Sequence, residues 1–397
     1  MEDQLSLAAL HFLRLHYNEA LAVYQKIFEE NRMFAAINVY IAICYFKLDF
    51  PENALEFVKS YLMLYPDSLA ANNLLNCINF KLGNTVVLDP SSFDSYYPAV
   101  RALYRHNHVI FSGGANALQV LPSLVDLVPE ALTNLVVYHL NRDDTDAAYR
   151  LINDVDPQTP HEYLLKAITY LLVGQRSLSN DHINAAKSFF RIVGESSSEC
   201  DTITGRLSMA AHHFLSGHFE DALIYMTSVK EFFYNDDRYN MNLGQALLCS
   251  GHYKETIDTL SEIHTLKSPL LDQLLTRAYV MNRQPQEAWD IFMKTRNVNE
   301  HPYLLKIIAH DSFQTRQFAS MARAYDALER LDPSPDHWVG KRAAVGGQFT
   351  LLARGKCTGK EMGEVLNYIS HNNHSQIETI VTAIGNFCRE NDIKLES

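Results

Sequence analysis

The stretch MAAHHFLSGHFEDALIYM (residues 209–226) is followed 34 residues later by LGQALLCSGHYKETIDTL (residues 243–260). Each copy carries one small residue near its start and a second one twelve positions further on. These small residues are Ala210, Ala222, Gly244 and Thr256. Two helices can cross closely only where neither side chain intrudes. We therefore expect each copy to be a tight helical hairpin, with Gly217 and Gly251 marking the turn.

The same spacing recurs near the start of the chain, where the small residues are Ala8, Ala20, Ala42 and Ala54. A period of 34 residues is typical of tetratricopeptide repeats. One hairpin cannot bury its apolar face alone, so such hairpins stack on one another into a solenoid whose long surfaces hold other proteins. The sequence therefore predicts an all-α tetratricopeptide-repeat superhelical solenoid of stacked antiparallel helix pairs, with a helical C-terminal cap.

The repeat frame divides the chain into four parts. We predict tetratricopeptide repeats over 1–83, an irregular or degenerate repeat segment over 84–128, further repeats over 129–334, and the helical cap over 335–397.

Three places interrupt this frame. Prolines within 84–98 should break the second helix of one unit. The segment Gly174–His182 adds about seven residues to a normal repeat turn, and we expect this insertion to bulge from one edge. In the cap, Gly346 and Gly347 should divide the chain into shorter helical pieces.

The first repeat starts almost at the first residue, with Leu7 and Leu10 on a flank that no capping helix covers. An uncovered apolar flank is a liability. We expect the chain to be a shortened form of a longer protein in which another repeat covers this flank. The alternative is that Met1 is a natural start and the first helix is its own cap.

Composition excludes several functional classes. The formal charge is −12 and no Lys/Arg cluster stands out, so nucleic-acid partners are not expected. No apolar run has the length of about 20 residues that a membrane-spanning helix needs, and no signal peptide is recognisable. The six cysteines lie far apart without a CxxC pair, which indicates reduced, mostly buried thiols in a cytosolic compartment.

No catalytic, cofactor-binding or metal site is predicted. The 17 histidines include no HExxH motif, and His11, His139 and His213 share one repeat position, which indicates a structural role. The segment 355–360 resembles a phosphate loop, but it has too few residues between its glycines, and Glu361 stands where Ser or Thr should bind magnesium.

A row of apolar residues recurs at one position of the first helices. It consists of Phe12, Phe46, Leu140, Phe214, Leu248, Val280 and Phe313. In this repeat type the position lies near the concave wall, so the row is our candidate partner-binding groove for an amphipathic helix. The alternative, that adjacent repeats or the C-terminal helices bury the row, stays equally open.

Several segments spread over the chain resemble the intraflagellar transport protein 56 family, also called tetratricopeptide repeat protein 26. They are EDQLSL (2–7), CYFKLD (44–49), GGANALQVLP (113–122), SECDTI (198–203), YNDD (234–237), LERLDP (328–333) and WVGKR (338–342). Members of the family carry further repeats upstream of the first of these segments, and the stretch 84–98 matches the family poorly.

The resemblance implies a non-catalytic scaffold subunit of intraflagellar transport complex B. It implies contacts with other subunits of that complex, intraflagellar transport protein 46 among them, and delivery of motility-related cargo into cilia and flagella. The expected locations are the cilium or flagellum and the basal body, with a cytoplasmic pool. Two alternatives are a cytosolic repeat adaptor for chaperones, whose carboxylate-gripping Lys/Asn set is not evident here, and an enzyme framed by repeats.

Overall fold

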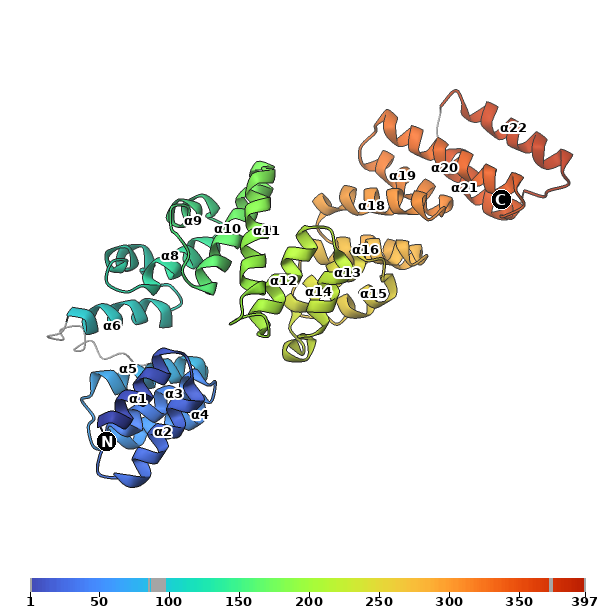
Figure 1. Ribbon diagram of the computed structural model, residues 1–397. Helices are drawn as coiled ribbons and strands as arrows, with labels where there is room; N and C mark the ends of the chain where they lie inside the picture. Colours follow the sequence, from blue (N-terminus) through green and yellow to red (C-terminus); the bar gives the residue numbers. More distant parts are fainter. Residues whose placement is uncertain (1, 85, 87–97, 371–373, 396–397) are drawn as a thin grey trace. The chain divides into compact units, whose positions relative to one another are not determined.

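The computed structural model describes residues 2–84, 86, 98–370 and 374–395. Every regular element in these residues is a helix (Figure 1). The chain divides into two compact units, Met1–Ala186 and Lys187–Ser397, and the division falls within one helix. The predicted all-α repeat fold is thereby confirmed.

The first unit consists of helical hairpins that follow one another along the chain, and from α1 to α10 each helix packs on its neighbour in sequence. Its helices are α1 (Glu2–Leu13), α2 (Tyr17–Glu30), α3 (Ile37–Lys47), α4 (Pro51–Leu62), α5 (Leu69–Lys81), α6 (Pro98–Phe111), α7 (Ala117–Val120), α8 (Glu130–Leu140), α9 (Thr145–Ile152), α10 (Pro160–Ser177) and α11 (Asn180–Glu195), which extends into the second unit. A short 3₁₀ helix covers Leu121–Leu124.

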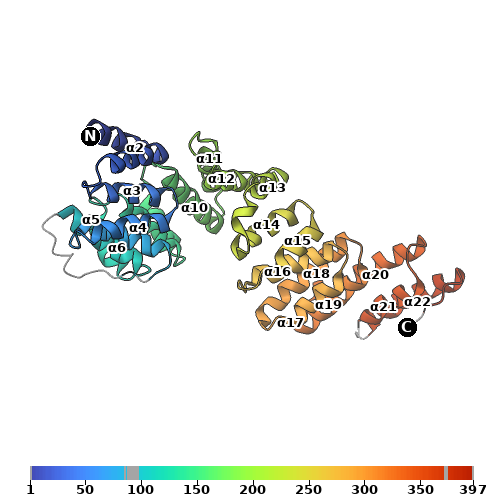
Figure 2. The same cartoon turned by 90° about the horizontal axis from the view of Figure 1, so that it is seen from below.

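The second unit continues the pattern, and Figure 2 shows α14 to α19 following one another in chain order. Its helices are α12 (Ile203–Leu215), α13 (Phe219–Thr227), α14 (Asp237–Cys249), α15 (Tyr253–Ser261), α16 (Pro269–Met281), α17 (Pro285–Lys294), α18 (His301–Gln314), α19 (Phe318–Leu331), α20 (Pro335–Ala353), α21 (Gly359–Ser370) and α22 (Ile377–Glu390). Short 3₁₀ helices cover Lys230–Phe233 and Val298–Glu300.

One backbone turn recurs inside the hairpins. The first helix ends in a residue with positive φ, and the next amide donates a hydrogen bond back across the turn, as His218 does to the carbonyl of His213 at 2.9 Å. This is the bonding pattern of a Schellman C-cap. The positive-φ residues at these turns are Leu15, Asp49, Gly83, Asp143, Gly217, Gly251, Arg283 and Arg316. The predicted glycine turns at Gly217 and Gly251 are confirmed, with φ of 81° and 84°.

The paired small residues of the repeats are all buried. A Cβ atom on Gly244 would overlap the side chain of Leu260 from the following helix, so glycine is required for this close approach. Around the small residues, each core cluster joins helices that are neighbours in the chain, such as the cluster of α12 to α14. Packing in each unit is therefore local, as expected for a repeat array.

The insertion does not bulge, so that expectation was wrong. Helix α10 runs 18 residues to Ser177 and α11 runs 16 residues from Asn180, so the extra residues lengthen the two helices of one hairpin. Thr159 and Glu162 cap the start of α10 by a reciprocal pair of bonds. Gly174 is buried beside α11, where a Cβ would lie 2.8 Å from Cγ1 of Ile183. The start of α11 can therefore approach α10 closely at Gly174.

The glycine pair of the cap does not break its helix either. Helix α20 runs without interruption for 19 residues from Pro335 to Ala353, through Gly346 and Gly347. A Cβ on Gly347 would overlap the ring of Phe318, and one on Gly340 would lie 2.5 Å from the ring of Tyr325. These two glycines therefore admit aromatic rings from α19, and the tertiary contact outweighs the low helix propensity of glycine.

Of the predicted irregular segment 84–128, residues 85 and 87–97 lie outside the described residues, so the expected break there is not addressed. The remainder is more regular than expected, because α6 is a 14-residue helix. It ends before Gly113 and Gly114, which have φ of 67° and 90° and turn the chain toward the short helix α7. A cluster of apolar side chains joins α6, α7 and α8.

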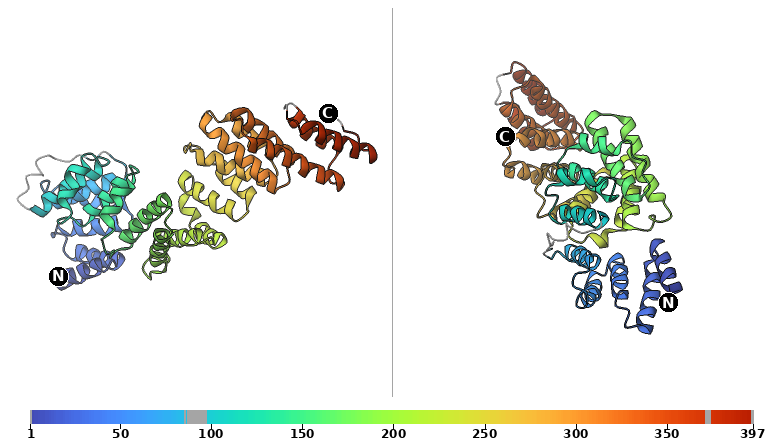
Figure 3. Two further views of the ribbon diagram at one scale, coloured as in Figure 1. Left: turned by 90° about the horizontal axis from the view of Figure 1, so that it is seen from above. Right: turned by 90° about the vertical axis from the view of Figure 1, so that its left-hand side faces the viewer.

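The predicted C-terminal cap is helical, and α20, α21 and α22 continue the second unit after α19 (Figure 3). Lys341 of α20 is fully buried. Its Nζ lies 3.2 Å from Oδ1 of Asp326 and forms a second ion pair with Glu329, both on α19. Arg330 pairs with the other oxygen of Asp326 at 2.7 Å. A buried charge is tolerated only when it is paired in this way.

The cysteines are all free, but fewer are buried than expected. Cys44 and Cys388 are buried, and burial raises the pKa of the Cys44 thiol to about 12, so that this thiol stays protonated. Cys200 and Cys249 are exposed, in contrast to the expectation of mostly buried thiols. None of the helices in the described ranges combines the length and the apolar character that crossing a bilayer requires.

Candidate functional site

The predicted apolar row lies at the carboxyl ends of the first helices of the hairpins. Each member is within two residues of its helix end. Their helices are α1 for Phe12, α3 for Phe46, α8 for Leu140, α12 for Phe214, α14 for Leu248, α16 for Val280 and α18 for Phe313. The row is thus next to the recurring turn in every repeat, as the shared repeat position predicts.

The structure does not expose the members of the row equally. Val280 is fully buried and Leu248 is 8% exposed, so both are core residues. Phe313 is 56% exposed. The other four members are half-buried. The row is therefore not a uniform apolar stripe, and the prediction that it binds a partner remains for the half-buried and exposed members only.

Most of the phenylalanines in the row contact the next helix of their own hairpin. Phe12 meets Tyr17 edge to face with ring centroids 5.2 Å apart, and Phe214 meets Phe219 in the same way at 5.3 Å. Such aromatic pairs favour this geometry because ring edges are electropositive. One part of each of these rings is therefore used inside the hairpin, and the remaining part is available at the surface.

Phe46 borders an apolar hollow in the first unit. The hollow has a volume of about 690 Å³ and is formed by α3, α5, α6 and α8. Its apolar walls include Ile43, Phe46, Leu74, Leu103 and Ile110. Mostly apolar concave sites with a few placed polar groups are the usual form of binding sites. The sequence predicts Phe46 as part of a partner-binding groove, but it does not predict the contributions of α5 and α6 to this hollow.

Polar groups of the same hollow are held in pairs. The amide of Asn107 donates a hydrogen bond to Oδ1 of Asn73 at 2.7 Å. The amide nitrogen of Asn134 lies 2.9 Å from Nε2 of His106. At the turn beside Phe46, Lys81 forms an ion pair with Asp49 at 2.6 Å and lies 5.1 Å from the centre of the Phe46 ring. The hollow thus combines apolar walls with a small set of fixed hydrogen-bonding groups.

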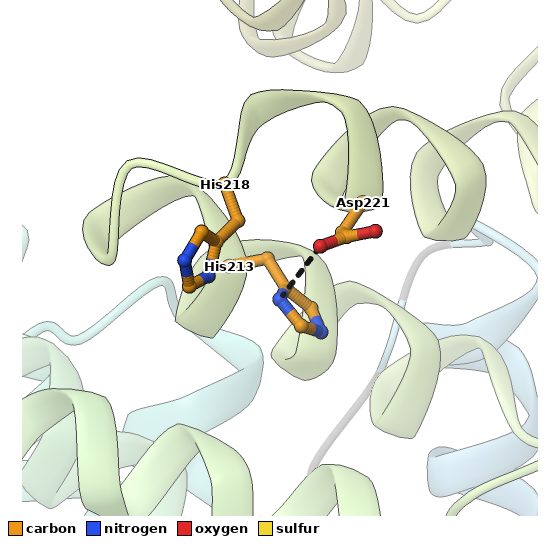
Figure 4. A group of neighbouring side chains, drawn as sticks. All are labelled: His213, His218 and Asp221. Atoms are coloured by element: carbon orange, nitrogen blue, oxygen red, sulfur yellow. Dashed lines mark ion pairs between the residues drawn. The ribbon is translucent and has the colours of Figure 1, made fainter.

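A second cluster lies at the turn between α12 and α13 and consists of His213, His218 and Asp221 (Figure 4). One ligand atom from each residue lies within 4.8 Å of those of the other two. His213 Nδ1 is 3.9 Å from Oδ2 of Asp221. Burial lowers the pKa of His213, although the Asp221 carboxylate acts in the opposite direction. Burial therefore favours the neutral imidazole of His213, which is the form that binds metals.

The sequence-based expectation did not include this cluster, because it considered only the HExxH motif and the repeat position that His213 shares with His11 and His139. The three residues follow the spacing His-x4-His-x2-Asp. That spacing brings side chains together only when a Schellman turn separates the first residue from the second. The signal was therefore present in the sequence, in combination with Gly217.

The segment that resembled a phosphate loop has a structural explanation. Thr358 and Glu361 exchange capping bonds at the start of α21, with the Thr358 amide donating to Oε2 of Glu361 at 2.7 Å and the Glu361 amide donating to the Thr358 hydroxyl at 3.3 Å. This is the pattern of a capping box. Glu361, which departs from the phosphate-loop motif, is thus the residue that the helix start requires.

Stacked hairpins with a period of 34 residues and a Schellman turn in each define a tetratricopeptide-repeat protein, a class whose members bind other proteins over helical surfaces. Residues 1–396 match the sequence profile of the family described as intraflagellar transport protein 56. A relative from Caenorhabditis elegans, the intraflagellar transport protein 56 homolog, is 35% identical over 425 residues, which cover 100% of this chain and 74% of that protein. The chain belongs to the intraflagellar transport protein 56 family.

Solved repeat structures show a more distant likeness. A tetratricopeptide repeat protein from Parabacteroides merdae has a TM-score of 0.34 and 13% identity, over 72% of this chain and 98% of that one. A chain of the APC/C hetero-tetramer Cut9-Hcn1 has a TM-score of 0.35 and 12% identity, over 95% of each chain. The fold assignment rests on the hairpins and turns of this chain and on its family.

Proposed function

We propose that this chain is a non-catalytic scaffold subunit of intraflagellar transport complex B. It binds other subunits of that complex, intraflagellar transport protein 46 among them, and helps to deliver motility-related cargo into cilia and flagella. The observation that carries the proposal is the family match over residues 1–396. The proposed locations are the cilium or flagellum and the basal body, with a cytoplasmic pool.

The architecture supports a scaffold because stacked hairpins provide long helical surfaces. The hairpins keep large apolar side chains at helix ends, and several remain accessible within the described residues. Exposed apolar patches of this kind typically mark protein-binding sites. The negative net charge favours partners with basic surfaces, since complementary charge increases the rate of encounter.

We propose the hollow beside Phe46 as one docking site for a partner helix. An amphipathic helix buries side chains at i, i+3, i+4 and i+7 in such a groove. The walls formed by Leu74, Leu103 and Ile110 supply the apolar contact, and the paired amides of Asn73 and Asn107 offer hydrogen bonds at its side. Phe313, which is 56% exposed, is the best candidate in the second unit.

The scaffold proposal is tested by association. The tagged full chain, expressed in ciliated cells, should co-purify with the other complex B subunits and should bind purified intraflagellar transport protein 46 directly. Absence of both associations would overturn the proposed role, whatever the docking site.

The docking site is tested with matched phenylalanine variants. Phe46→Ala should weaken binding of intraflagellar transport protein 46 by about 2 kcal/mol, because buried aromatics dominate interface energies. Its control is Phe50→Ala, which removes a ring that is 53% exposed four residues further along and does not line the hollow. Phe313→Ala and its control Phe232→Ala, with rings 56% and 69% exposed, form the second pair. Equal affinity for all four variants would show that the row does not carry the interface.

A further inference from the structure

Three side chains able to bind a metal converge at the turn between α12 and α13. His213 is near the end of α12, His218 is the N-cap residue of α13, and Asp221 is in the first turn of α13. The Schellman bond from the His218 amide to the His213 carbonyl, 2.9 Å long, fixes the separation of the two histidines. The backbone turn therefore brings the three residues near one another, and their side-chain conformations bring the ligand atoms together.

The groups have capacity left for a ligand. Nδ1 of His213 is buried from solvent and has no hydrogen-bond partner in the described part of the chain. The ring of His213 stacks on Tyr225 at 5.5 Å between centroids, which fixes its orientation. His218 and Asp221 are exposed, so their side chains can rotate toward His213. Buried polar atoms without partners are uncommon and call for a physical explanation.

We propose that His213, His218 and Asp221 form a binding site for a divalent transition-metal cation of the zinc class. Two imidazoles and one carboxylate are a common three-residue ligand set for zinc, with water in the fourth position. Ligand atoms in a tetrahedral zinc site lie about 3.4 Å apart, as follows from metal–ligand distances of about 2.1 Å. The present separations, up to 4.8 Å, exceed this value by little more than 1 Å, and the exposed side chains of His218 and Asp221 have room to move.

Corresponding turns of other repeats provide an internal comparison. At 237–270 the equivalent residues are Leu247, His252 and Glu255, so the first ligand is absent. At 129–162 the equivalents His139 and Asp144 lie 3.2 Å apart, but Ala147 replaces the third ligand.

The first repeat has the same spacing in His11, His16 and Glu19. Among the described residues, however, the cluster at α12 and α13 is the group whose ligand atoms gather within 4.8 Å. The site is thus a specialised version of a shared turn.

A cation bound here would join the end of α12 to the first turn of α13. It would add a link across the hairpin at the place where the backbone changes direction. The site would therefore stabilise the fold of this repeat and leave the helix surfaces of its neighbours unchanged.

The test is calorimetric titration of the metal-free full chain with Zn²⁺ alone. We expect His218→Ala and Asp221→Asn each to weaken one equivalent of zinc binding by at least about tenfold. Loss of an outer-shell partner of a metal typically costs about 10–100-fold in affinity, and loss of a direct ligand should cost no less. Both residues are exposed, so neither variant should lower the melting temperature without zinc.

The matched controls are His252→Ala and His16→Ala, which remove histidines from the equivalent turn position. Both should bind that equivalent of zinc as the unsubstituted chain does. Saturation with zinc should also raise the melting temperature of the unsubstituted chain by about 2 °C or more, but not that of His218→Ala. Unchanged affinity in His218→Ala and Asp221→Asn, or an equal loss in the controls, would overturn the proposal.

Discussion

The repeats at 203–236 and 237–270 have the same backbone turn and differ in the side chains around it. Gly217 and Gly251 have nearly equal φ, 81° and 84°. At the apolar-row position, however, Phe214 is half-buried, whereas Leu248 is 8% exposed and part of the core. The turn therefore fixes the hairpin, and individual side chains at its ends are free to take different roles.

The largest expected effect concerns the row residues of these two repeats. Leu248→Ala should lower the free energy of unfolding by about 2–5 kcal/mol, because it leaves a cavity in a packed core. Phe214→Ala should cost less than half as much, since part of the ring already faces solvent. Both losses of stability are measured in the full chain, from the melting temperature and from hydrogen exchange of α12 and α14. Equal losses would show that the two positions are equivalent core sites and would remove Phe214 from the candidate groove.

A second test changes the small residues at the helix crossings. Gly244→Ala should destabilise the chain by about 1–3 kcal/mol, because the new methyl group overlaps Leu260, which is 1% exposed. The gain of about 1 kcal/mol in helix propensity offsets only part of the overlap penalty. In the preceding repeat, Ala210→Leu and Ala222→Leu should each cost about 1–3 kcal/mol by overpacking. Unchanged melting of both leucine variants would refute a close crossing at these residues.

A third test addresses the feature that the two repeats share. Gly217→Ala and Gly251→Ala should each cost about 1 kcal/mol, because alanine is strained at positive φ. A Cβ on Gly217 meets no atom within 4 Å, and one on Gly251 meets only Tyr253 at 3.9 Å, so the effect is confined to the backbone. The losses should be equal within error. A clearly larger loss at one turn would mean that the turns differ.

The smallest expected effect is a pH dependence specific to the first of the two turns. Burial lowers the pKa of His213 in the folded chain. The Asp221 carboxylate acts to raise this pKa, and His212 and His218 act to lower it. In the unfolded chain, the His213 imidazole takes up its proton with an ordinary pKa of about 6.5. Below that pH the unfolded state therefore binds more protons than the folded state, and the stability of the fold falls as pH falls.

Leucine stands at the equivalent position in the next repeat, so His213→Leu is the natural substitution. With EDTA present, this variant should lose less of its melting temperature between pH 7.5 and 5.5 than the unsubstituted chain. A matched substitution, His252→Leu, which removes the histidine of the turn in the next repeat, serves as control. A steeper pH dependence in His213→Leu would contradict the direction of the pKa shift.

The repeat frame predicted the fold because turns and small residues recur at fixed spacing. It failed where tertiary contacts override local signals. The sequence predicts that Gly346 and Gly347 break the helix. In the structure, Gly347 provides space for the Phe318 ring, and α20 continues through both glycines. The sequence predicts that the insertion ending at His182 bulges from one edge, yet its residues extend the two helices of a hairpin, and Gly174 lets the start of α11 approach α10.

The candidate sites were predicted less completely than the fold. A repeat position specifies which side of a helix a residue occupies, but it does not specify how much of that side the next hairpin covers. Val280 and Phe313 share one position and differ from fully buried to 56% exposed. Likewise, His213 and Asp221 are on different helices, and only the turn conformation reveals that they are neighbours.

The buried Lys341 gives the C-terminal helices an internal reporter. Its amine lies between Asp326 and Glu329, and it is 0% exposed while α20 remains on α19. An acylating reagent, or an enzyme that modifies lysines, can reach this nitrogen only after α20 has separated from α19. The rate at which Lys341 becomes labelled, relative to that of surface lysines, therefore measures how often the end of the chain opens.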